Sequence, residues 1–211
     1  MMRHITMVPV MALLSVMLLT GCWVQSLYPF YTDQTRIAIP AHIVGQWVLT
    51  DEEGDDQGSK PWSFSEGKIH SHYKGVEMSS EAVFFKVDDV LFVDVEGGES
   101  VFVKGDDLED IWLNAHRHSV HQVYKVETTD NEMTLLPLDI DWVLKQIESG
   151  AVKLSYYRPA PKSENEDNKN PIILTENSEG LTHFLKYCIT KPAAFKGEEV
   201  IRYTFRKVEK K

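Results

Sequence analysis

Five of the eight histidines stand close enough along the chain to suggest metal binding. His70 and His72 have the two-residue spacing that places both imidazole rings on one face of a strand. His116, His118 and His121 form a second group, and neutral imidazole binds zinc or copper. However, His121 does not share the alternation of the other two, and no carboxylate or cysteine stands at ligand spacing nearby. We therefore expect surface or sheet-rim histidines, with no metal and no cofactor.

The carboxylates and the catalytic motifs give little support for an enzyme. Acidic clusters at 51–56 and 106–110 lack the alternating Asp/Asn pattern of a calcium loop and are expected to be solvated loops. The chain contains no nucleophile elbow, His-Glu-x-x-His, phosphate loop or dinucleotide fingerprint. An enzyme whose carboxylates meet only in the folded chain is the least favoured of three hypotheses.

The residue with the clearest chemistry is Cys22. A positively charged start with Arg3 precedes an apolar run at 5–19, and Leu19-Thr20-Gly21-Cys22 then resembles a bacterial lipobox. This order predicts a lipoprotein signal peptide over 1–21. Cleavage between Gly21 and Cys22 would be followed by acylation of the Cys22 thiol and of the new amine. The apolar run is shorter than the roughly 20 residues that span a bilayer, whereas two or more acyl chains hold a protein stably on a membrane.

Composition restricts the partners of the mature chain. The net charge is −10, and removal of 1–21, which holds one arginine and no acid, makes it −11. An acidic chain repels phosphate backbones, so we expect no nucleic-acid partner. Trp23, rather than an aspartate, follows Cys22. In a Gram-negative envelope this favours the periplasmic face of the outer membrane.

The second cysteine has no partner once Cys22 carries lipid, so no disulfide is expected. Cys188 lies in "LTHFLKYCI", where Leu181, Phe184, Leu185 and Ile189 share its helical spacing. This pattern predicts a buried thiol that packs as a small hydrophobic side chain.

The elements that must position these residues are mostly strands. Short β-branched and aromatic runs between turn residues predict strands at 43–50, 62–64, 69–73, 80–87, 90–95, 101–103, 120–127, 133–136, 172–175 and 200–208. Helices are expected at 140–147, capped by Asp139, and at about 177–190, while 152–157 is extended. We divide the chain into the signal peptide, a lipidated, irregular and aromatic leader at 22–42 that packs on the domain, and one β-rich domain at 43–211. The alternative for the leader is that some of its aromatic residues sit at the membrane interface, where amphipathic rings are favoured.

Several segments resemble a group of small, poorly characterised bacterial lipoproteins. "SLYPFYT" after the lipobox, the strand "IVGQWVL", and the helical segments "LDIDWVLKQI" and "LTENSEGLTHFLKYC" carry the resemblance. The second helix of that group often has a glutamate three residues after its cap, where this chain has Gly180, so a reciprocal capping bond would be missing. The group has no assigned activity, and the resemblance therefore implies a fold rather than a function.

Gly45-x-Trp47 is also similar to the lipocalin/calycin signature, in which the tryptophan closes one end of a barrel around an apolar cavity. That similarity makes Trp47, Trp62, Phe64 and Phe92 candidates for a ligand pocket or for ordinary core. Two helices and a long middle section depart from the lipocalin pattern.

Taken together, the sequence predicts a mainly β (α+β) protein. An antiparallel meander forms a lipocalin/calycin-like barrel or a sandwich, and two helices pack on it. The expected function is that of a lipid-anchored cell-envelope protein acting as a structural or protein-interaction module. The alternative is a lipocalin-like binder of a small apolar ligand.

Overall fold

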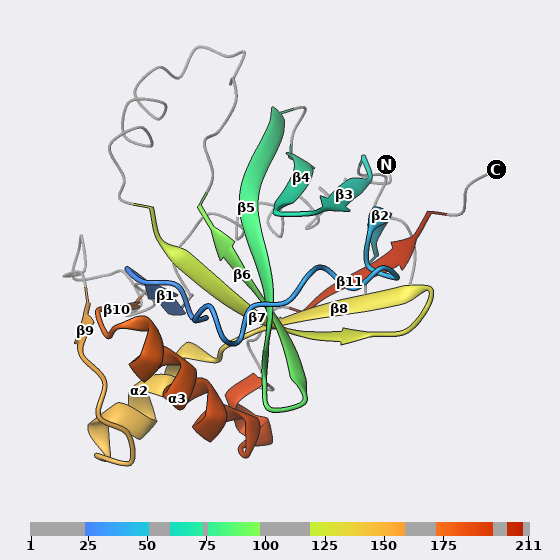
Figure 1. Cartoon of the computed structure of the whole chain (residues 1–211). Coiled ribbons are helices and arrows are strands. Elements are labelled where there is room, and N and C mark those ends of the chain that lie inside the picture. The colour runs from blue at the N-terminus through green and yellow to red at the C-terminus, as the bar shows by residue number, and fades with distance from the viewer. Residues whose placement is uncertain are drawn as a thin grey trace, which may run out of the picture.

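The computed structural model describes residues 24–50, 60–73, 76–97, 119–158, 172–195 and 202–208. The strands are β1 (Val24–Ser26), β2 (Gly45–Thr50), β3 (Trp62–Ser65), β4 (Lys68–Tyr73), β5 (Val76–Val87), β6 (Val90–Glu96), β7 (His121–Thr128), β8 (Glu132–Pro137), β9 (Tyr156–Tyr157), β10 (Ile172–Leu174) and β11 (Tyr203–Lys207). The helices are α2 (Ile140–Glu148), α3 (Ser178–Ile189) and the 3-10 turn η3 (Pro192–Phe195) (Figure 1).

Eight of these strands close into an antiparallel barrel. The order β6-β5-β4-β3-β2-β11-β8-β7 is completed by pairing of β6 with β7, so the first and last strands of the series meet. Neighbours in the chain are neighbours in the barrel, except that β11 returns to lie between β2 and β8. The predicted mainly β fold with an antiparallel meander and two packed helices is confirmed, in its barrel form.

The barrel begins at a glycine with a special backbone. Gly45 has φ of +132°, a backbone conformation that residues other than glycine rarely adopt. The strand starts at this residue rather than at the predicted residue 43. Two residues later the fully buried Trp47 donates from Nε1 to the Ile43 carbonyl oxygen at 2.7 Å. The turn before β2 and the indole ring thus fix one another.

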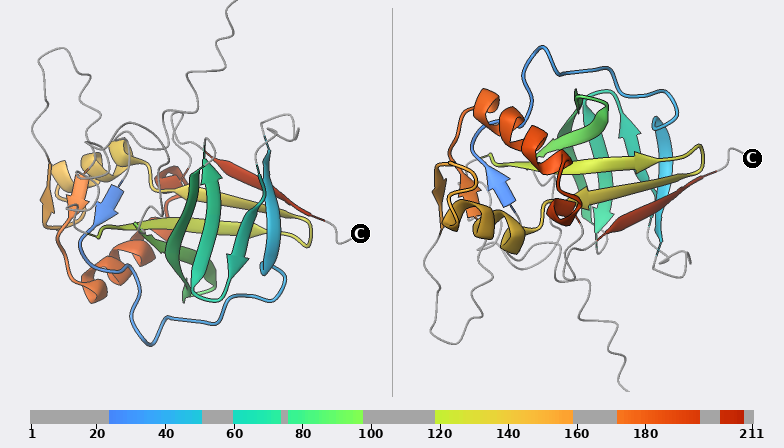
Figure 2. Two further views of the ribbon diagram at one scale, coloured as in Figure 1. Left: turned by 90° about the horizontal axis from the view of Figure 1, so that it is seen from above. Right: turned by 90° about the horizontal axis from the view of Figure 1, so that it is seen from below.

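Two hydrophobic cores lie on the two sides of the barrel wall. The interior core consists of Ile43, Trp47, Phe64, Ile69, Ala82, Phe84, Val93, Tyr124, Val126, Met133, Leu135, Tyr203 and Phe205. The outer core joins the other face of β5, β6, β7 and β8 to the helices, with Phe85, Phe92, Val123 and Leu136 packed against Leu181, Phe184, Leu185 and Cys188. In both views of Figure 2, α2 and α3 lie at the end of the barrel opposite the β7–β8 hairpin.

The helices begin as their sequences predict. The Asp139 carboxylate accepts from the Trp142 amide at 2.9 Å, and the Asn177 side chain accepts from the Gly180 amide at 2.9 Å. Gly180 cannot return a bond to the cap, and instead Glu176 Oε1 lies 3.4 Å from the Asn177 amide as its acceptor. Neither α2 nor α3, the two α-helices in the described ranges, has the length and hydropathy of a membrane-spanning helix.

The leader differs from the prediction of an irregular segment. Residues 24–26 form β1, which pairs with β7 on one side and runs parallel to β10 on the other. β9 then pairs with β10, so β1, β10 and β9 extend the sheet beyond the barrel. The expected packing of the leader on the domain is confirmed for Phe30 and Tyr31, which pack in or against the outer core with Val24, whereas Leu27 and Tyr28 are exposed.

Candidate functional site

The four predicted aromatic residues do not form one site. Trp47 and Phe64 are buried inside the barrel, and Trp62 lies half-buried against the same core. Phe92 faces the other side of the wall, where it stacks on Phe85 with ring centroids 5.5 Å apart. The fold therefore brings three of the four together and places Phe92 in the core under the helices.

Close ring contacts occupy the interior around β2, β3 and β11. Phe205 lies between Trp62 and Phe64, with centroid distances of 5.2 and 5.9 Å. Trp47, Phe64, Phe205 and Met133 are each less than 2% exposed. Side chains, rather than open space, fill this part of the barrel.

A more polar region of the interior surrounds two tyrosines. The Tyr124 and Tyr203 rings meet edge to face at 6.1 Å, and the Tyr124 hydroxyl donates to Gln122 Oε1 at 2.9 Å. Burial raises the pKa of Tyr124 well above its ordinary value, with Tyr203 adding to the effect, and burial alone raises the pKa of Tyr203. Both phenols therefore stay neutral at physiological pH.

The buried charged group among the described residues is Asp94 on β6, and it has two hydrogen-bond partners. Asp94 is 2% exposed, and its Oδ2 accepts from the Phe30 amide at 2.7 Å. Its Oδ1 lies 2.8 Å from His121 Nδ1 on β7. On the far side of the leader, the Thr182 hydroxyl of α3 lies 3.2 Å from the Phe30 carbonyl oxygen and 2.8 Å from the Ser178 carbonyl oxygen, and its one proton is shared between these two acceptors. Asp94 thus fastens the leader between the barrel and α3, and we call this arrangement the leader latch.

The sequence prediction for His121 was incomplete. His121 lies near the sheet rim, as expected. The sequence has no carboxylate at ligand spacing nearby, and the pairing of β6 with β7 supplies Asp94 from 27 residues away. The available signal was an aspartate inside the apolar run "VLFVDV", because a charged residue in a buried strand needs a partner.

Opposing influences set the pKa values of the pair. Burial lowers the pKa of His121, but the hydrogen bond and charge of Asp94, with Glu96 nearby, outweigh it and raise that pKa above 6.5. Burial raises the pKa of Asp94, and the His121 contact and the Phe30 amide offset only part of that change.

A raised histidine pKa predicts a specific dependence of stability on pH. The contribution of protonated His121 is complete below its ordinary pKa and is lost as pH rises through the folded value. The free energy of unfolding of the wild type should therefore fall between about pH 6 and about pH 8. In Asp94→Asn the negative partner is gone and burial dominates, so this fall should shrink or reverse. Urea titrations of both proteins at the two pH values test this prediction. An equal fall in the free energy of unfolding with pH in the wild type and in Asp94→Asn would contradict it.

Ser26 completes a set of residue types known from hydrolases, but not their geometry. It is the direct partner of His121 in the β1–β7 pair and shares its face. However, the Ser26 hydroxyl donates to the Leu174 carbonyl oxygen at 3.2 Å and accepts from the Tyr28 amide at 3.1 Å. Ser26 is fully buried. An activated serine donates to its histidine and faces substrate, so Ser26 is a structural residue here.

The remaining histidine candidates are not brought together. His70 lies half-buried on β4, opposite Ser63 and Ser79. The side chain of His72, His116 and His118 lie outside the described residues, as do the acidic clusters and the predicted strand at 101–103. Within the described ranges no group of three or more His, Cys, Asp or Glu side chains is placed to hold a metal ion.

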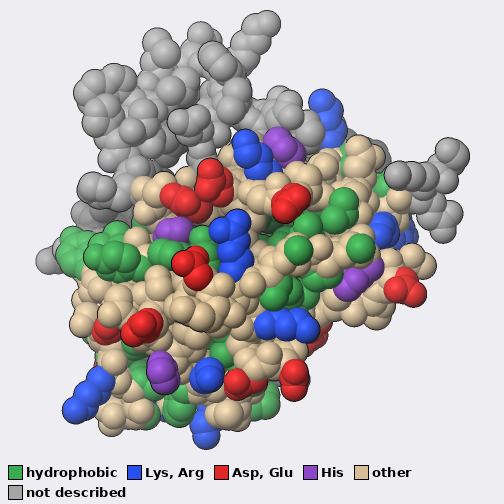
Figure 3. All heavy atoms as spheres, in the orientation of Figure 1, with side chains coloured by type: hydrophobic (Ala, Val, Ile, Leu, Met, Phe, Trp, Pro, Cys, Tyr) green, Lys and Arg blue, Asp and Glu red, His purple; other side chains and the backbone are tan. Residues whose placement is uncertain are grey.

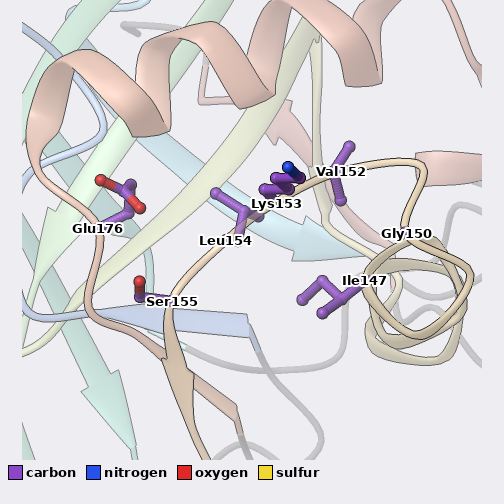
Figure 4. A pocket seen from close by; sticks show the side chains of 7 residues that line it. All are labelled: Ile147, Gly150, Val152, Lys153, Leu154, Ser155 and Glu176. Atoms are coloured by element: carbon purple, nitrogen blue, oxygen red, sulfur yellow. The ribbon is translucent and has the colours of Figure 1, made fainter.

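A groove of about 400 Å³ opens beside α2. Its walls are Ile147, Gly150, Val152, Lys153, Leu154, Ser155 and Glu176. Figure 4 shows Glu176 and Ser155 on one side of Leu154 and Ile147 on the other. The Glu176 carboxylate already caps the start of α3 through the Asn177 amide. The groove is therefore mixed in character, and its acid has a structural partner.

Cys188 has the predicted environment. It is fully buried among the outer-core residues of α3, and burial raises the pKa of its thiol. A buried thiol with a raised pKa is poorly nucleophilic. Gly21 and Cys22, the predicted cleavage and acylation residues, lie outside the described residues.

Comparisons with protein families, with curated proteins and with solved structures found no match to this chain.

Proposed function

We propose that this chain is a lipid-anchored cell-envelope protein that acts as a structural or protein-interaction module. The lipobox-like sequence ending at Cys22 supports the anchor. The observation that carries the proposal is β1, which begins two residues after Cys22 and is hydrogen-bonded into the sheet between β7 and β10. An acyl group on Cys22 would therefore be joined to the folded domain by almost no free chain.

The close packing of side chains in the described part of the barrel interior favours a module over a carrier. A carrier of a small apolar molecule needs an internal cavity of roughly 300 Å³ or more. Trp47, Phe64 and Phe205 instead pack together inside the barrel at less than 2% exposure. The lipocalin-like binder remains the second candidate, because the closed eight-strand meander of the described chain is the architecture that such binders use.

Replacing Cys22 tests the anchor directly. We expect Cys22→Ala to move from the membrane fraction to the soluble fraction of the envelope, because both acyl attachment points depend on that residue. Cys188→Ala is the matched control, since it removes the other cysteine from a buried position and should leave the protein with the membrane. Continued sedimentation of Cys22→Ala with membranes would remove the anchor from the proposal.

The same soluble variant separates the module from the carrier. Native mass spectrometry of Cys22→Ala purified from its own host should give the mass of the chain alone if the barrel is filled. A bound apolar small molecule would instead favour the carrier and identify the ligand chemistry. If the mass is that of the chain alone, cross-linking in the envelope is the next experiment, because it would identify protein partners of the module.

A further inference from the structure

Exposed large hydrophobic side chains gather at the β1–β10–β9 extension. The described residues include five of them, and four lie on β9 or directly after β1: Leu27 at 42%, Tyr28 at 50%, Tyr156 at 38% and Tyr157 at 57%. We call these four residues the tyrosine edge. Exposed apolar groups scattered singly need no explanation, whereas a gathered set indicates a contact surface.

Strand register places these residues side by side. Tyr157 pairs with Ile173, which pairs with Gln25, so the three share the face turned away from the helices. The Leu27 amide donates to the Leu174 carbonyl oxygen, and Leu174 pairs with Tyr156. Figure 3 shows hydrophobic side chains on the side of the molecule where Figure 1 places this extension. Tyr156 shares the face of the buried Leu174, and Tyr157 points to the opposite face with Ile173. The tyrosine edge therefore borders the rim of the extension on both faces of the sheet.

Chain length ties this surface to the proposed anchor. Cys22 precedes Gln25 by three residues, which span at most about 11 Å when extended. Tyr157 lies two strand spacings from Gln25, or about 10 Å. The side chain of Tyr157 thus starts within about 20 Å of the atom that would carry the acyl chains.

We propose that the tyrosine edge lies in the headgroup region of the lipid bilayer and orients the barrel on the membrane. This inference rests on the proposed acylation of Cys22. Tyrosine is favoured at the membrane–water interface because its ring is apolar and its hydroxyl reaches water. Lys153 is exposed three residues before Tyr156, and such long cationic side chains pair with lipid phosphates at this depth. In this proposal the acyl chains on Cys22 attach the protein to the membrane, and the tyrosine edge sets the orientation of the barrel.

The proposed orientation places the β7–β8 hairpin far from the lipid. Ser26 pairs with His121 at the start of β7, and the hairpin tip near Asp130 lies nine residues further along an extended strand. That separation is on the order of 30 Å. All three ribbon views place the hairpin and β9 at opposite ends of the molecule (Figures 1 and 2). Asp130, which is exposed, is therefore a matched control position.

Site-specific quenching tests the orientation in the full acylated chain. Tyr157→Cys, Leu27→Cys and Asp130→Cys are each labelled with an environment-sensitive fluorophore, while the buried Cys188 stays unlabelled. The proteins are reconstituted into vesicles of phosphatidylethanolamine and phosphatidylglycerol, with and without nitroxide-labelled headgroups. We expect the nitroxide to reduce the signal at 157 and 27 by about twofold or more and to leave the signal at 130 nearly unchanged. Leu27→Cys provides a second reading if Tyr157→Cys misfolds.

The outcomes distinguish this inference from the anchor on which it rests. Failure of the acylated protein to float with vesicles would count against the anchor itself. Flotation with equal signals at 157, 27 and 130 would overturn the orientation and leave the anchor in place. If 157 is protected from aqueous quencher in native membranes but is not quenched by nitroxide lipid, a protein covers the edge and the lipid assignment is wrong.

Discussion

Trp47→Ala should lower the free energy of unfolding by about 3–5 kcal/mol. Trp47 is fully buried at the end of the barrel core, and its indole Nε1–H supplies the hydrogen bond to the Ile43 carbonyl oxygen. Lys207 lies opposite on the neighbouring strand β11, and its amine is 5.3 Å from the centre of the Trp47 ring. Truncation to alanine removes the packed ring, leaves a cavity that neighbouring strands cannot close, and deprives a buried carbonyl of its donor.

Two other variants separate these contributions. Trp47→Phe keeps an aromatic ring and loses the donor, so it should cost about 1–3 kcal/mol. Trp62→Ala removes a half-buried indole that lies directly opposite on β3, and it should cost less than Trp47→Ala. Urea denaturation followed by far-ultraviolet circular dichroism measures all three without depending on tryptophan emission. A loss well under about 1 kcal/mol for Trp47→Ala would mean that the ring is not core.

The local elements were largely predictable because each depends on short-range patterns. The β-branched and aromatic runs between turns located the strands from β2 to β8, and the Asp139 cap with its apolar stripe located α2. Boundaries moved where tertiary contacts decide them. The strand predicted at 200–208 is β11 at Tyr203–Lys207, and of the extended segment at 152–157 only Tyr156–Tyr157 pairs as β9.

The leader strand was missed because its pairing is not local. β1 is three residues long, too short for any alternation to be read, and its parallel partner β10 lies 148 residues away. A parallel pair of this kind leaves no turn signal in the sequence. Its effect on the site is large, since β1 brings Ser26 beside His121 and sets the position of Phe30.

The alternation of apolar and polar residues in the sequence also could not predict which of the two cores each aromatic residue joins. The middle parts of β5 and β6 are buried on both faces, because the outer core lies on one side of the wall and the interior core on the other. Phe84 and Phe85 are therefore consecutive and both buried. A strand that is buried on both faces has a continuous apolar sequence with no alternation of apolar and polar residues. The sequence therefore could not predict that Phe92 faces the helices, because this depends on the packing of α3 on the barrel.

Asp94→Ala should also destabilise the protein by about 3–5 kcal/mol, because it breaks a buried pair and leaves its partners without an acceptor. The Phe30 amide and His121 Nδ1 both bond to this carboxylate. Asp130→Ala, at the exposed hairpin tip, is the control and should stay within about 0.5 kcal/mol of the wild type. Urea denaturation at one fixed pH compares the two.

A second measurement shows whether the loss arises at the leader latch. Hydrogen exchange at the Phe30 amide should become faster in Asp94→Ala than in a variant of equal stability whose change lies inside the barrel, because only the first frees that amide locally. Asp94→Asn retains one oxygen for the Phe30 amide and should fall between the wild type and Asp94→Ala. If exchange at Phe30 follows global stability alone, Asp94 is an ordinary buried group. Selective release would mean that one carboxylate controls how firmly the segment next to the proposed anchor is held to the barrel.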